Sequence, residues 1–449
     1  MGTIKIKKGL NLSLKGEPEQ VISDGHPVDK VALIGYDYPG MKPTMKVAVG
    51  DDVKAGQLLF TDKKMEGINY TSPGTGKVIS INRGLKRAFE SIVIRLEGDE
   101  YINFKSFGED KLGSLKRDDV KELLLESGQW TSLRERPYGK VADPEVIPNS
   151  IFVTAMDTNP LAPSIVKIIE GKEKDIENGL KILSLLTDGK IFFCKDPELN
   201  IALPDIGSLC VEEFSGPHPA GLPGTHIHFL DPAGPNKRVW HIGVQDVIAI
   251  SRLFLSGKLY FEKIISISGP SALSPKLIRT RTGADIESLI AGEVREGDNA
   301  VISGSVLEGR RAEGNVGYLG KFHQQITVLR EGKDRKFFGW LGLGFNSFSV
   351  KNILISSLLR RKKFDLTTSM EGGKRAIIPV ENYDAVMPLD IVPAYLLRAL
   401  AVDDIEEAEK LGCLELIEED LALCTFVCAS KNDYGSILRR NLTIIEKEG

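Results

Sequence analysis

The chain has 449 residues, of which 42% are hydrophobic, so we expect two to four domains with several buried cores. Its 58 basic and 62 acidic residues give a formal net charge of −4, which argues against a dedicated nucleic-acid binder because such proteins carry a strong basic excess. Five cysteines are too few for a disulfide framework in a chain of this length, and they favour a reducing compartment.

Membrane segments are not predicted. The first 16 residues lack the apolar core of a secretion signal. The most apolar stretch, residues 239–255, is interrupted by His241, Gln245, Asp246 and Arg252, whereas a spanning helix needs roughly 18 or more apolar residues in a row. We therefore expect a protein that is cytosolic or is held at a membrane only through partners.

Residues 1–102 are predicted to be all β, because short apolar runs alternate with turns rich in glycine, proline and aspartate. Residues 45–64, MKVAVGDDVKAGQLLFTDKK, and the returning stretch 70–84 resemble the barrel-sandwich fold of biotinyl and lipoyl domains. We interpret this first region as a structural barrel that carries no modified lysine.

The rest of the chain is predicted to form three further domains. In residues 103–256, helical patterns alternate with short β-rich runs, which is typical of a Rossmann-like α/β domain with a mainly parallel sheet. Residues 257–330 contain short strands around one helical run and suggest a β-grasp-like module, and residues 331–449 are mostly helical. The expected fold class is thus multidomain, α/β and α+β.

The densest group of histidines lies in the proline- and glycine-rich stretch 215–235, SGPHPAGLPGTHIHFLDPAGP. A loop fixed by so many turn residues often shapes a pocket or an interface, and its candidate residues are His218, Gly221, Gly224, His226 and His228. Two alternatives stay open. The loop is plain structure, or His226 and His228 point the same way on a strand and bind a metal together with His218 or His241.

Two cysteines near the C-terminus, Cys424 and Cys428, have the C-x3-C spacing that ends the iron–sulfur ligand run C-x2-C-x2-C-x3-C-P. The two earlier ligand positions of that run are Glu418 and Leu421. A 4Fe–4S cluster needs four thiolates, and this region offers only this pair and Cys413, so we expect no cluster and no metal here.

A basic run follows the aliphatic stretch ILISSLL and consists of Arg360, Arg361, Lys362 and Lys363. Four adjacent cations beside aliphatic surface suggest docking onto an acidic partner surface or lipid headgroups. The alternative is a solvated helix end.

Four stretches resemble the A subunit of the sodium-translocating NADH:quinone reductase, the NqrA family: residues 40–64, 215–228, 317–332 and the pair 386–400 with 411–428. They occur in order over nearly the whole chain. A more distant resemblance joins the α/β and β-grasp-like regions to the C subunit of Rnf complexes and the flavin subunit of complex I. This resemblance identifies the helical C-terminal region as a ferredoxin-like remnant that has lost its clusters.

In those distant relatives a glycine-rich loop lets backbone amides approach the flavin phosphate. The matching stretch here is residues 126–140, where Trp130, Leu133 and Arg134 stand in place of glycines, and we expect their side chains to fill the space that a flavin needs. The following turn, residues 154–160, has one acidic residue where the relatives have several. Both departures argue against flavin and NADH on this chain.

The resemblance implies a bacterial respiratory complex, a translocase that passes electrons from NADH to ubiquinone and exports Na⁺. This chain would be its peripheral subunit on the cytoplasmic face of the inner membrane, with the other subunits as partners and no catalysis of its own. Flavins, iron–sulfur and NADH would belong to those other subunits, which leaves ubiquinone as the one open ligand. The alternative function is a free-standing NADH-dependent flavin dehydrogenase.

Overall fold

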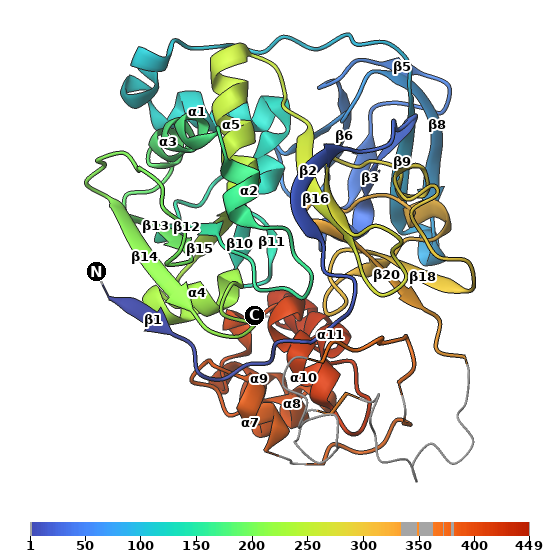
Figure 1. The fold of residues 1–449 in the computed structure, drawn as a ribbon. Coiled ribbons are helices and arrows are strands. Elements are labelled where there is room, and N and C mark those ends of the chain that lie inside the picture. The colour runs from blue at the N-terminus through green and yellow to red at the C-terminus, as the bar shows by residue number, and fades with distance from the viewer. Residues whose placement is uncertain (1, 334–347, 350–361, 371, 379–380, 449) are drawn as a thin grey trace.

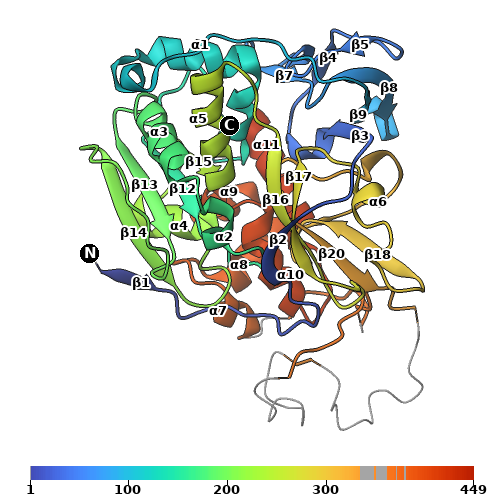
Figure 2. The ribbon, with the colours of Figure 1, turned by 45° about the horizontal axis from the view of Figure 1, so that its top comes forward.

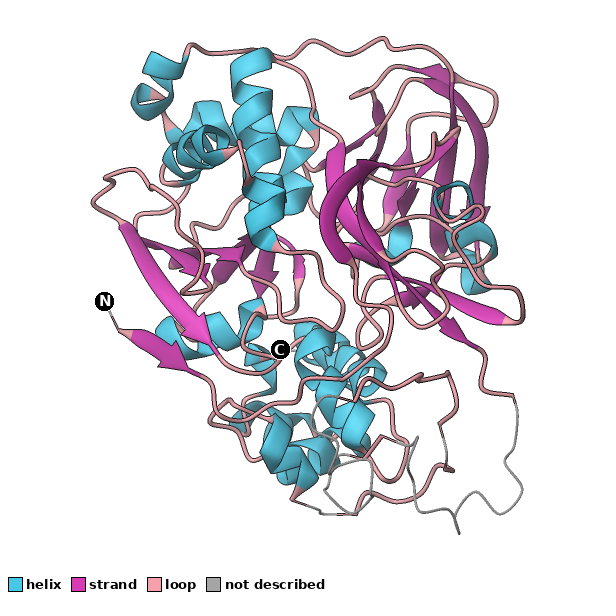
Figure 3. Cartoon of the chain, in the orientation of Figure 1, coloured by secondary structure: helices cyan, strands magenta, loops and turns pink. Residues whose placement is uncertain are grey.

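The computed structural model describes residues 2–333, 348–349, 362–370, 372–378 and 381–448. Figure 1 shows a barrel at the upper right, an α/β layer structure at the left, a second sheet below the barrel and a group of helices at the bottom. Figure 3 shows the same division by secondary structure, with strands concentrated in three regions and helices above and below the large sheet.

The large sheet has seven strands in the order β1-β14-β13-β12-β15-β10-β11, and it is parallel from β1 to β15. Its central strands read SIFVTA and KIFFCK, which are the continuous apolar runs of strands covered on both faces. The strands are β1 (Thr3–Lys5), β10 (Arg134–Arg136), β11 (Lys140–Val141), β12 (Ser150–Ala155), β13 (Lys190–Lys195), β14 (Leu209–Ser215) and β15 (Val239–Gly243).

Helices cover both faces of this sheet. On one face lie α1 (Arg117–Ser127), α2 (Ile165–Ile169), α3 (Glu173–Leu183) and α5 (Val244–Ser256), while α4 (Pro223–Leu230) packs on the other. Two of them, α1 and α5, end at Gly128 and Gly257, whose φ angles of 77° and 69° are left-handed and favour glycine. The mainly parallel α/β arrangement thus matches what the alternating sequence pattern predicts.

The barrel-sandwich consists of two small antiparallel sheets. Its core includes Phe60 and Tyr70, whose rings stack with centroids 4.6 Å apart. The hydroxyl of Thr71 donates to the Ser127 carbonyl at 2.7 Å, so the barrel rests on the C-terminal end of α1. The strands are β3 (Lys30–Ile34), β5 (Asp52–Val53), β8 (Gly76–Arg83) and β9 (Phe89–Leu96), and opposite them β4 (Pro43–Met45), β6 (Leu58–Asp62) and β7 (Asn69–Thr71).

The second sheet has six strands in the order β19-β18-β20-β16-β17-β2. The short helix α6 (Ile286–Leu289) buries Ile286 and Leu289 in its core. The strands are β2 (Glu19–Asp24), β16 (Glu262–Ser268), β17 (Lys276–Arg281), β18 (Asn299–Ser303), β19 (Arg310–Arg311) and β20 (Gln325–Arg330).

The first 24 residues differ from the sequence expectation, which placed them in the barrel. Strand β1 pairs in parallel with β14, where Thr3 faces Glu213, and β2 pairs with β17, where Ile22 faces Leu277. The N-terminal segment therefore completes two other sheets. The sequence of a short strand does not indicate which sheet edge it pairs with, because its partners here lie more than 200 residues away in the chain.

Of the C-terminal region that the sequence pattern predicts to be mostly helical, residues 381–448 are largely helical and have their own core around Leu396, Leu400, Leu438 and Leu442. In Figure 2 these helices lie between the large sheet and the second sheet. No helix in the described part of the chain is both long and apolar enough to cross a membrane. The elements are α7 (Asn382–Val386), α8 (Pro393–Ala401), α9 (Ile405–Lys410), α10 (Ala422–Val427), α11 (Tyr434–Glu448) and the 3-10 turns η8 (Cys413–Glu415) and η9 (Glu418–Leu421).

A testable consequence concerns the crossing of α3 and α5. A Cβ atom on Gly179 would lie 2.5 Å from the Val247 Cγ1 atom and 2.6 Å from its carbonyl oxygen. We expect Gly179→Val to lower the free energy of unfolding by about 1–3 kcal/mol through overpacking, measured by urea denaturation. Gly207→Ala is the control, since that position has no atom within 4 Å. Equal stability of the two variants would contradict the tight crossing.

Candidate functional site

All four parts of the fold contribute to one cavity of about 600 Å³. Its floor comes from β10, β12 and β15 of the large sheet, and its walls from the loops beside β18 and β20 of the second sheet. Asp37, at the end of the 3-10 turn η1 (Gly35–Asp37), and Glu419 of η9 close two further sides. The cavity is of the size that small organic ligands occupy.

The floor brings three polar side chains to one face of the sheet. His241 of β15 lies opposite both Phe152 of β12 and Arg134 of β10, and Thr154 follows Phe152 by two residues. Because side chains alternate along a strand, Thr154, His241 and Arg134 share a face. Thr154 Oγ1, His241 Nε2, Arg134 Nε and the nearby Asn159 Oδ1 are buried and find no hydrogen-bond partner within the described ranges.

Unpartnered buried polar atoms are rare in folded proteins, and in the described part of the chain five of them, these four and Arg310 Nε, belong to residues that line one cavity. Burial, together with Arg134 and Arg136 nearby, holds the pKa of His241 well below its usual range, so this ring is neutral. The Arg134 guanidinium lies over the Phe322 ring, 4.8 Å from its centroid, which adds an aromatic surface to the wall. The cavity is therefore suited to a flat ligand with polar atoms at its edge.

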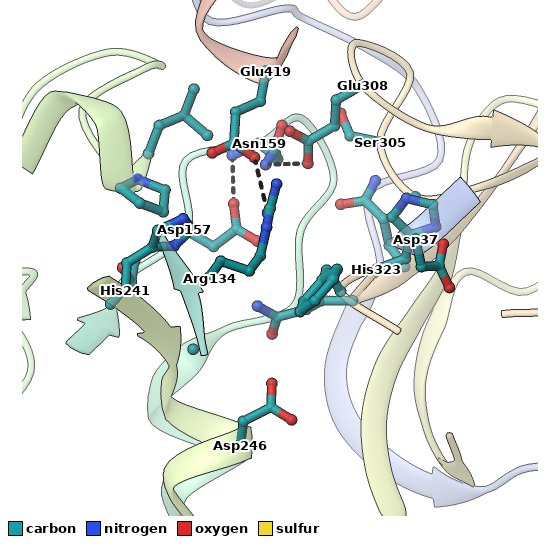
Figure 4. A pocket seen from close by; sticks show the side chains of 18 of the residues that line it. Asp37, Arg134, Asp157, Asn159, His241, Asp246, Ser305, Glu308, His323 and Glu419 are labelled. Atoms are coloured by element: carbon teal, nitrogen blue, oxygen red, sulfur yellow. Dashed lines mark hydrogen bonds and ion pairs between the residues drawn. The ribbon is translucent and has the colours of Figure 1, made fainter. Parts of the chain in front are cut away.

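One side of the cavity is acidic (Figure 4). The Asn159 side chain donates to Glu308 Oε1 at 3.2 Å, and the Asn159 backbone N–H donates to Asp157 Oδ1 at 2.8 Å. Arg134 lies 3.9 Å from a Glu419 oxygen. Burial is the main cause that raises the pKa of Asp157, Glu308 and Glu419, and neighbouring carboxylates raise those of Glu308 and Glu419 further.

The opposite side holds cations together with the carboxylates Asp37 and Asp246. Lys263 is buried and donates to the Lys321 carbonyl, and burial lowers the pKa of its ammonium to about 8. Lys321 in turn pairs with Asp246 at 3.1 Å. His323 accepts or donates a 2.8 Å hydrogen bond with the Ser303 hydroxyl, and burial lowers its pKa to about 4. A ligand in the cavity would thus meet different charges at its two ends.

The residues that replace the relatives' glycines do not all act as the sequence comparison suggested. Trp130 is buried in the core on the other face of the sheet, where its ring meets Trp240 edge-on at 5.4 Å and its Nε1 donates to the Ala142 carbonyl at 2.7 Å. Leu133 lies in the same core. Only Arg134 reaches the cavity. The expectation that all three fill the ligand space is therefore wrong for this cavity, because Trp130 lies in the 3-10 turn Gln129–Ser132 and Leu133 follows it, and both turn into the core before β10 begins at Arg134.

The histidine-rich stretch is partly helical. His226 and His228 lie on α4, not on a strand, so they do not point the same way. His226 is fully buried against Phe214, with ring centroids 4.4 Å apart, while His228 bonds Glu415 at 2.7 Å and accepts the Asp390 N–H at 2.9 Å. In the part of the chain that the structure describes, no group of three or more potential ligands could hold a metal ion. The helix was not predicted from the sequence, because a stretch this rich in glycine and proline is typical of a loop.

This stretch instead contacts the C-terminal helices of the same chain. A Cβ on Gly224 would come within 2.1 Å of Asp420 Oδ1, and one on Gly221 within 2.7 Å of the Thr158 nitrogen, so both positions need glycine for a close approach. His218 is buried, and its ring Nδ1 lies 3.2 Å from the Thr158 hydroxyl. Its backbone N–H donates to Asn11 Oδ1. Gly221 also lines the cavity. Whether these residues serve a function beyond packing stays a prediction.

Arg136 fixes the C-terminal helices to the large sheet. Its side chain is fully buried and donates to Asp420 at 2.6 Å, to Glu419 at 3.1 Å and to the Glu415 carbonyl at 2.8 Å, a set of contacts that we call the Arg136 clasp. A buried ion pair of this kind resists separation because each charge would be left without a partner at low dielectric constant. The acidic turn η9 is thus held against β10, and it positions Glu419 at the cavity.

The four positions of the incomplete cluster motif serve packing and ion pairing in this fold. Glu418 pairs with Arg439 at 2.5 Å, and Leu421 is buried in the C-terminal core. Cys424 is buried, which raises its pKa to about 12. Cys428 accepts a hydrogen bond from the Tyr383 hydroxyl at 3.2 Å. That this region binds no cluster remains an expectation.

Part of the basic run lies outside the described residues, namely Arg360 and Arg361. Lys362 is half-buried, and Lys363 pairs with Glu17 at the surface. The run's proposed contact with a partner therefore stays a prediction.

Comparison with known proteins shows the family. Three family models match, described as the NqrA N-terminal barrel-sandwich hybrid domain over residues 4–97, the NqrA second alpha/beta domain over 115–259 and the NQRA C-terminal domain over 264–314. The A subunit of the Na(+)-translocating NADH-quinone reductase from Hahella chejuensis is 55% identical over 99% of this chain and 100% of its own length. The chain belongs to this family.

Other members of the NqrA family are similar over the same extent. The proteins of Saccharophagus degradans and Pseudomonas aeruginosa are 53% and 52% identical over 99% of this chain and all of their own length. A solved NAD⁺-reducing NiFe-hydrogenase in the H₂-reduced state covers 49% of this chain and 48% of its own, at 11% identity and a TM-score of 0.34. That score is too low to support an argument about the fold.

The Arg136 clasp of this NqrA family member generates a stability prediction. We expect Arg136→Met to lower the free energy of unfolding by about 3–5 kcal/mol, because Asp420 and Glu419 lose their buried partner. Denaturant titration measures the effect. The control is Arg440→Met, which removes an exposed pair with Asp403 and should cost less than about 1 kcal/mol. A loss for Arg136→Met as small as that of the control would mean that the clasp does not hold the C-terminal helices.

The buried histidines predict a loss of stability in acid. Burial lowers the pKa of His226 to about 3 and that of His218 to about 4, below the ordinary value of 6.5. Between these values the unfolded chain binds more protons, so stability is fully present above pH 6.5 and is lost as the pH falls toward 4. Each such histidine contributes a slope of about 1.4 kcal/mol per pH unit in that range.

We expect His226→Asn to reduce the slope of unfolding free energy against pH by about 1.4 kcal/mol per pH unit, the contribution of one histidine. The measurement is the free energy of unfolding at several pH values between 6.5 and 4. His26→Asn is the control, since His26 is an exposed residue that pairs only with Glu293. If both variants keep the slope of the unaltered chain, His226 does not contribute to acid unfolding.

Proposed function

We propose that this chain is the peripheral A subunit of a bacterial sodium-translocating NADH:quinone reductase, and that its cavity binds a quinone head group. The relatives' names supply the complex, which oxidises NADH, reduces quinone and moves Na⁺. In this proposal the chain lies on the cytoplasmic face and contributes architecture. The flavins, the iron–sulfur centre and the NADH site belong to partner subunits.

One observation carries the quinone assignment: the cavity floor has hydrogen-bond donors that no protein group uses. The Thr154 hydroxyl and the Arg134 Nε–H are both buried and unpartnered within the described ranges. A quinone ring presents only acceptors at its edge, so it would satisfy such donors. Phe322, Met156 and Ile242 line the same cavity and offer apolar contacts for a flat ring.

The alternative of a free-standing NADH-dependent flavin dehydrogenase has less support. Its flavin would need a phosphate cradle of backbone amides, and the matching stretch, residues 126–140, instead forms the end of α1, a buried 3-10 turn and β10. The colour of the purified chain separates the two functions, since a flavoprotein is yellow. Under our proposal the chain is colourless.

The C-terminal helices are the best candidates for docking to membrane-embedded partners. Val392, Tyr395 and Val402 are apolar and exposed on and beside α8. The basic run 360–363 belongs to the same C-terminal part of the sequence, and in this proposal its four cations add to the docking surface. Such a surface suits a protein that has no spanning helix in its described part and must be held by partners.

Thr154→Val tests the quinone site. The substitution keeps the shape of the side chain and removes a hydroxyl that makes no bond in the protein, so the free energy of unfolding should not fall. The affinity of the purified chain for a short-chain ubiquinone, measured by calorimetry, should fall about threefold to tenfold. Thr443→Val, remote on α11, is the control. Unchanged affinity in Thr154→Val would refute a quinone on this floor.

A further inference from the structure

The acidic side of the cavity has more carboxyl groups than cations to balance them. Arg136 is shared between Asp420 and Glu419, at 2.6 and 3.1 Å, and Arg134 approaches Glu419 at 3.9 Å. Asp157 and Glu308 make no ion pair with any cation in the described part of the chain. Burial raises the pKa of Asp157, Glu308 and Glu419, and neighbouring carboxylates raise those of the last two further, so this group holds a proton more readily than an exposed carboxyl does.

Glu308 is the carboxyl that best keeps this proton. Within the described ranges its carboxyl accepts one hydrogen bond, from the Asn159 side chain at 3.2 Å, a neutral donor. Burial and the nearby Glu419 and Asp157 raise the pKa of Glu308 well above its usual range. Asp157, in contrast, accepts the Asn159 backbone N–H at 2.8 Å, which favours its ionised form. Figure 4 shows Glu308 on the cavity wall, beside Asn159 and across from Arg134.

A protonated carboxyl and an ionised one recognise different ligands. The protonated form has an O–H that can donate to a carbonyl oxygen, whereas the ionised form can only accept. A quinone ring has two carbonyl acceptors at its edge, and its reduced form has two hydroxyl donors in their place. A single titrating carboxyl in contact with the ring therefore discriminates between the two forms.

We propose that Glu308 is the residue by which this cavity distinguishes an oxidised from a reduced quinone. When protonated, Glu308 donates to a carbonyl oxygen of the quinone, and when ionised it accepts from a hydroxyl group of the quinol. The inference rests on the proposed quinone site and concerns binding alone, with no bond or electron transferred by this residue. Glu308 is thus a specificity-determining residue of that site.

The sign of the pH dependence follows from this exchange. As the pH rises through the raised pKa of Glu308, the donor is lost, so quinone binding weakens and quinol binding strengthens. The charged and titratable groups that face Glu308 come from the turn after β12, from β10 and from η9. They are Asp157, Arg134, Glu419 and Asp420. Lys263, whose pKa burial lowers to about 8, lies elsewhere in the same cavity and titrates within the pH range of the test below.

The test compares two ligands across pH with the full chain. Binding of a short-chain ubiquinone, and of its quinol kept reduced under argon, is measured by calorimetry from pH 6 to 9. For the unaltered chain, the ratio of quinone affinity to quinol affinity should fall by about threefold to tenfold between pH 6 and pH 9. A change of this size is the contribution of one hydrogen bond. Glu308→Gln should abolish this change, because an amide is a donor and an acceptor at every pH.

A matched control and a second variant keep the result interpretable. Glu296→Gln, an exposed position in the same sheet domain, should retain the pH dependence of the unaltered chain, which includes any effect of Lys263. If a thermal unfolding measurement shows that Glu308→Gln is not folded, Glu308→Ala is used in its place. The Ala variant should bind quinone more weakly at pH 6 and show the same loss of pH dependence.

Two failures can be told apart. If the unaltered chain does not bind quinone, or if Thr154→Val binds it unchanged, the proposed quinone site is wrong and this inference falls with it. If Thr154→Val weakens binding but the affinity ratio does not depend on pH, or depends on it equally in Glu308→Gln, the quinone site stands. Discrimination by Glu308 is then overturned.

Discussion

The buried guanidinium of Arg136 is the interaction on which the rest of the arrangement depends. It joins β10 of the large sheet to Asp420, Glu419 and the Glu415 carbonyl of the C-terminal region. Gly224 of α4 provides the room for Asp420 beside it. Because a buried charge without its partner is strongly unfavourable, the C-terminal helices and the sheet have one relative position, and the cavity between them has a fixed wall.

The cavity takes its character from this arrangement. The sheet supplies unpartnered donors at Thr154 and Arg134, the turn η9 supplies Glu419, and the second sheet supplies Glu308 and Phe322. No single domain contains enough of these groups to bind a ligand. The acidic turn η9 is thereby part of both the Arg136 clasp and the cavity wall, through Asp420 and Glu419.

The stretch 126–140 is divided between the core and the cavity. Trp130 and Leu133 pack into the core on the far face of the sheet, and only Arg134 of that stretch enters the cavity. This stretch therefore contributes one side chain to the cavity and packs the others against the sheet.

The sequence by itself determined the local structure: the barrel hairpin around 45–64, the buried strands SIFVTA and KIFFCK, the helices capped by Gly128 and Gly257, and the incomplete cysteine motif. It also carried the family resemblance. Only the tertiary structure decided that residues 1–24 complete two distant sheets, that His226 and His228 lie on a helix, and that Glu308, Arg134 and Glu419 meet. The sheet pairings and the cavity depend on residues more than 100 positions apart, for which a single sequence has no periodicity to show. The helix at His226 and His228 is local, but the glycines and prolines around it are typical of a loop.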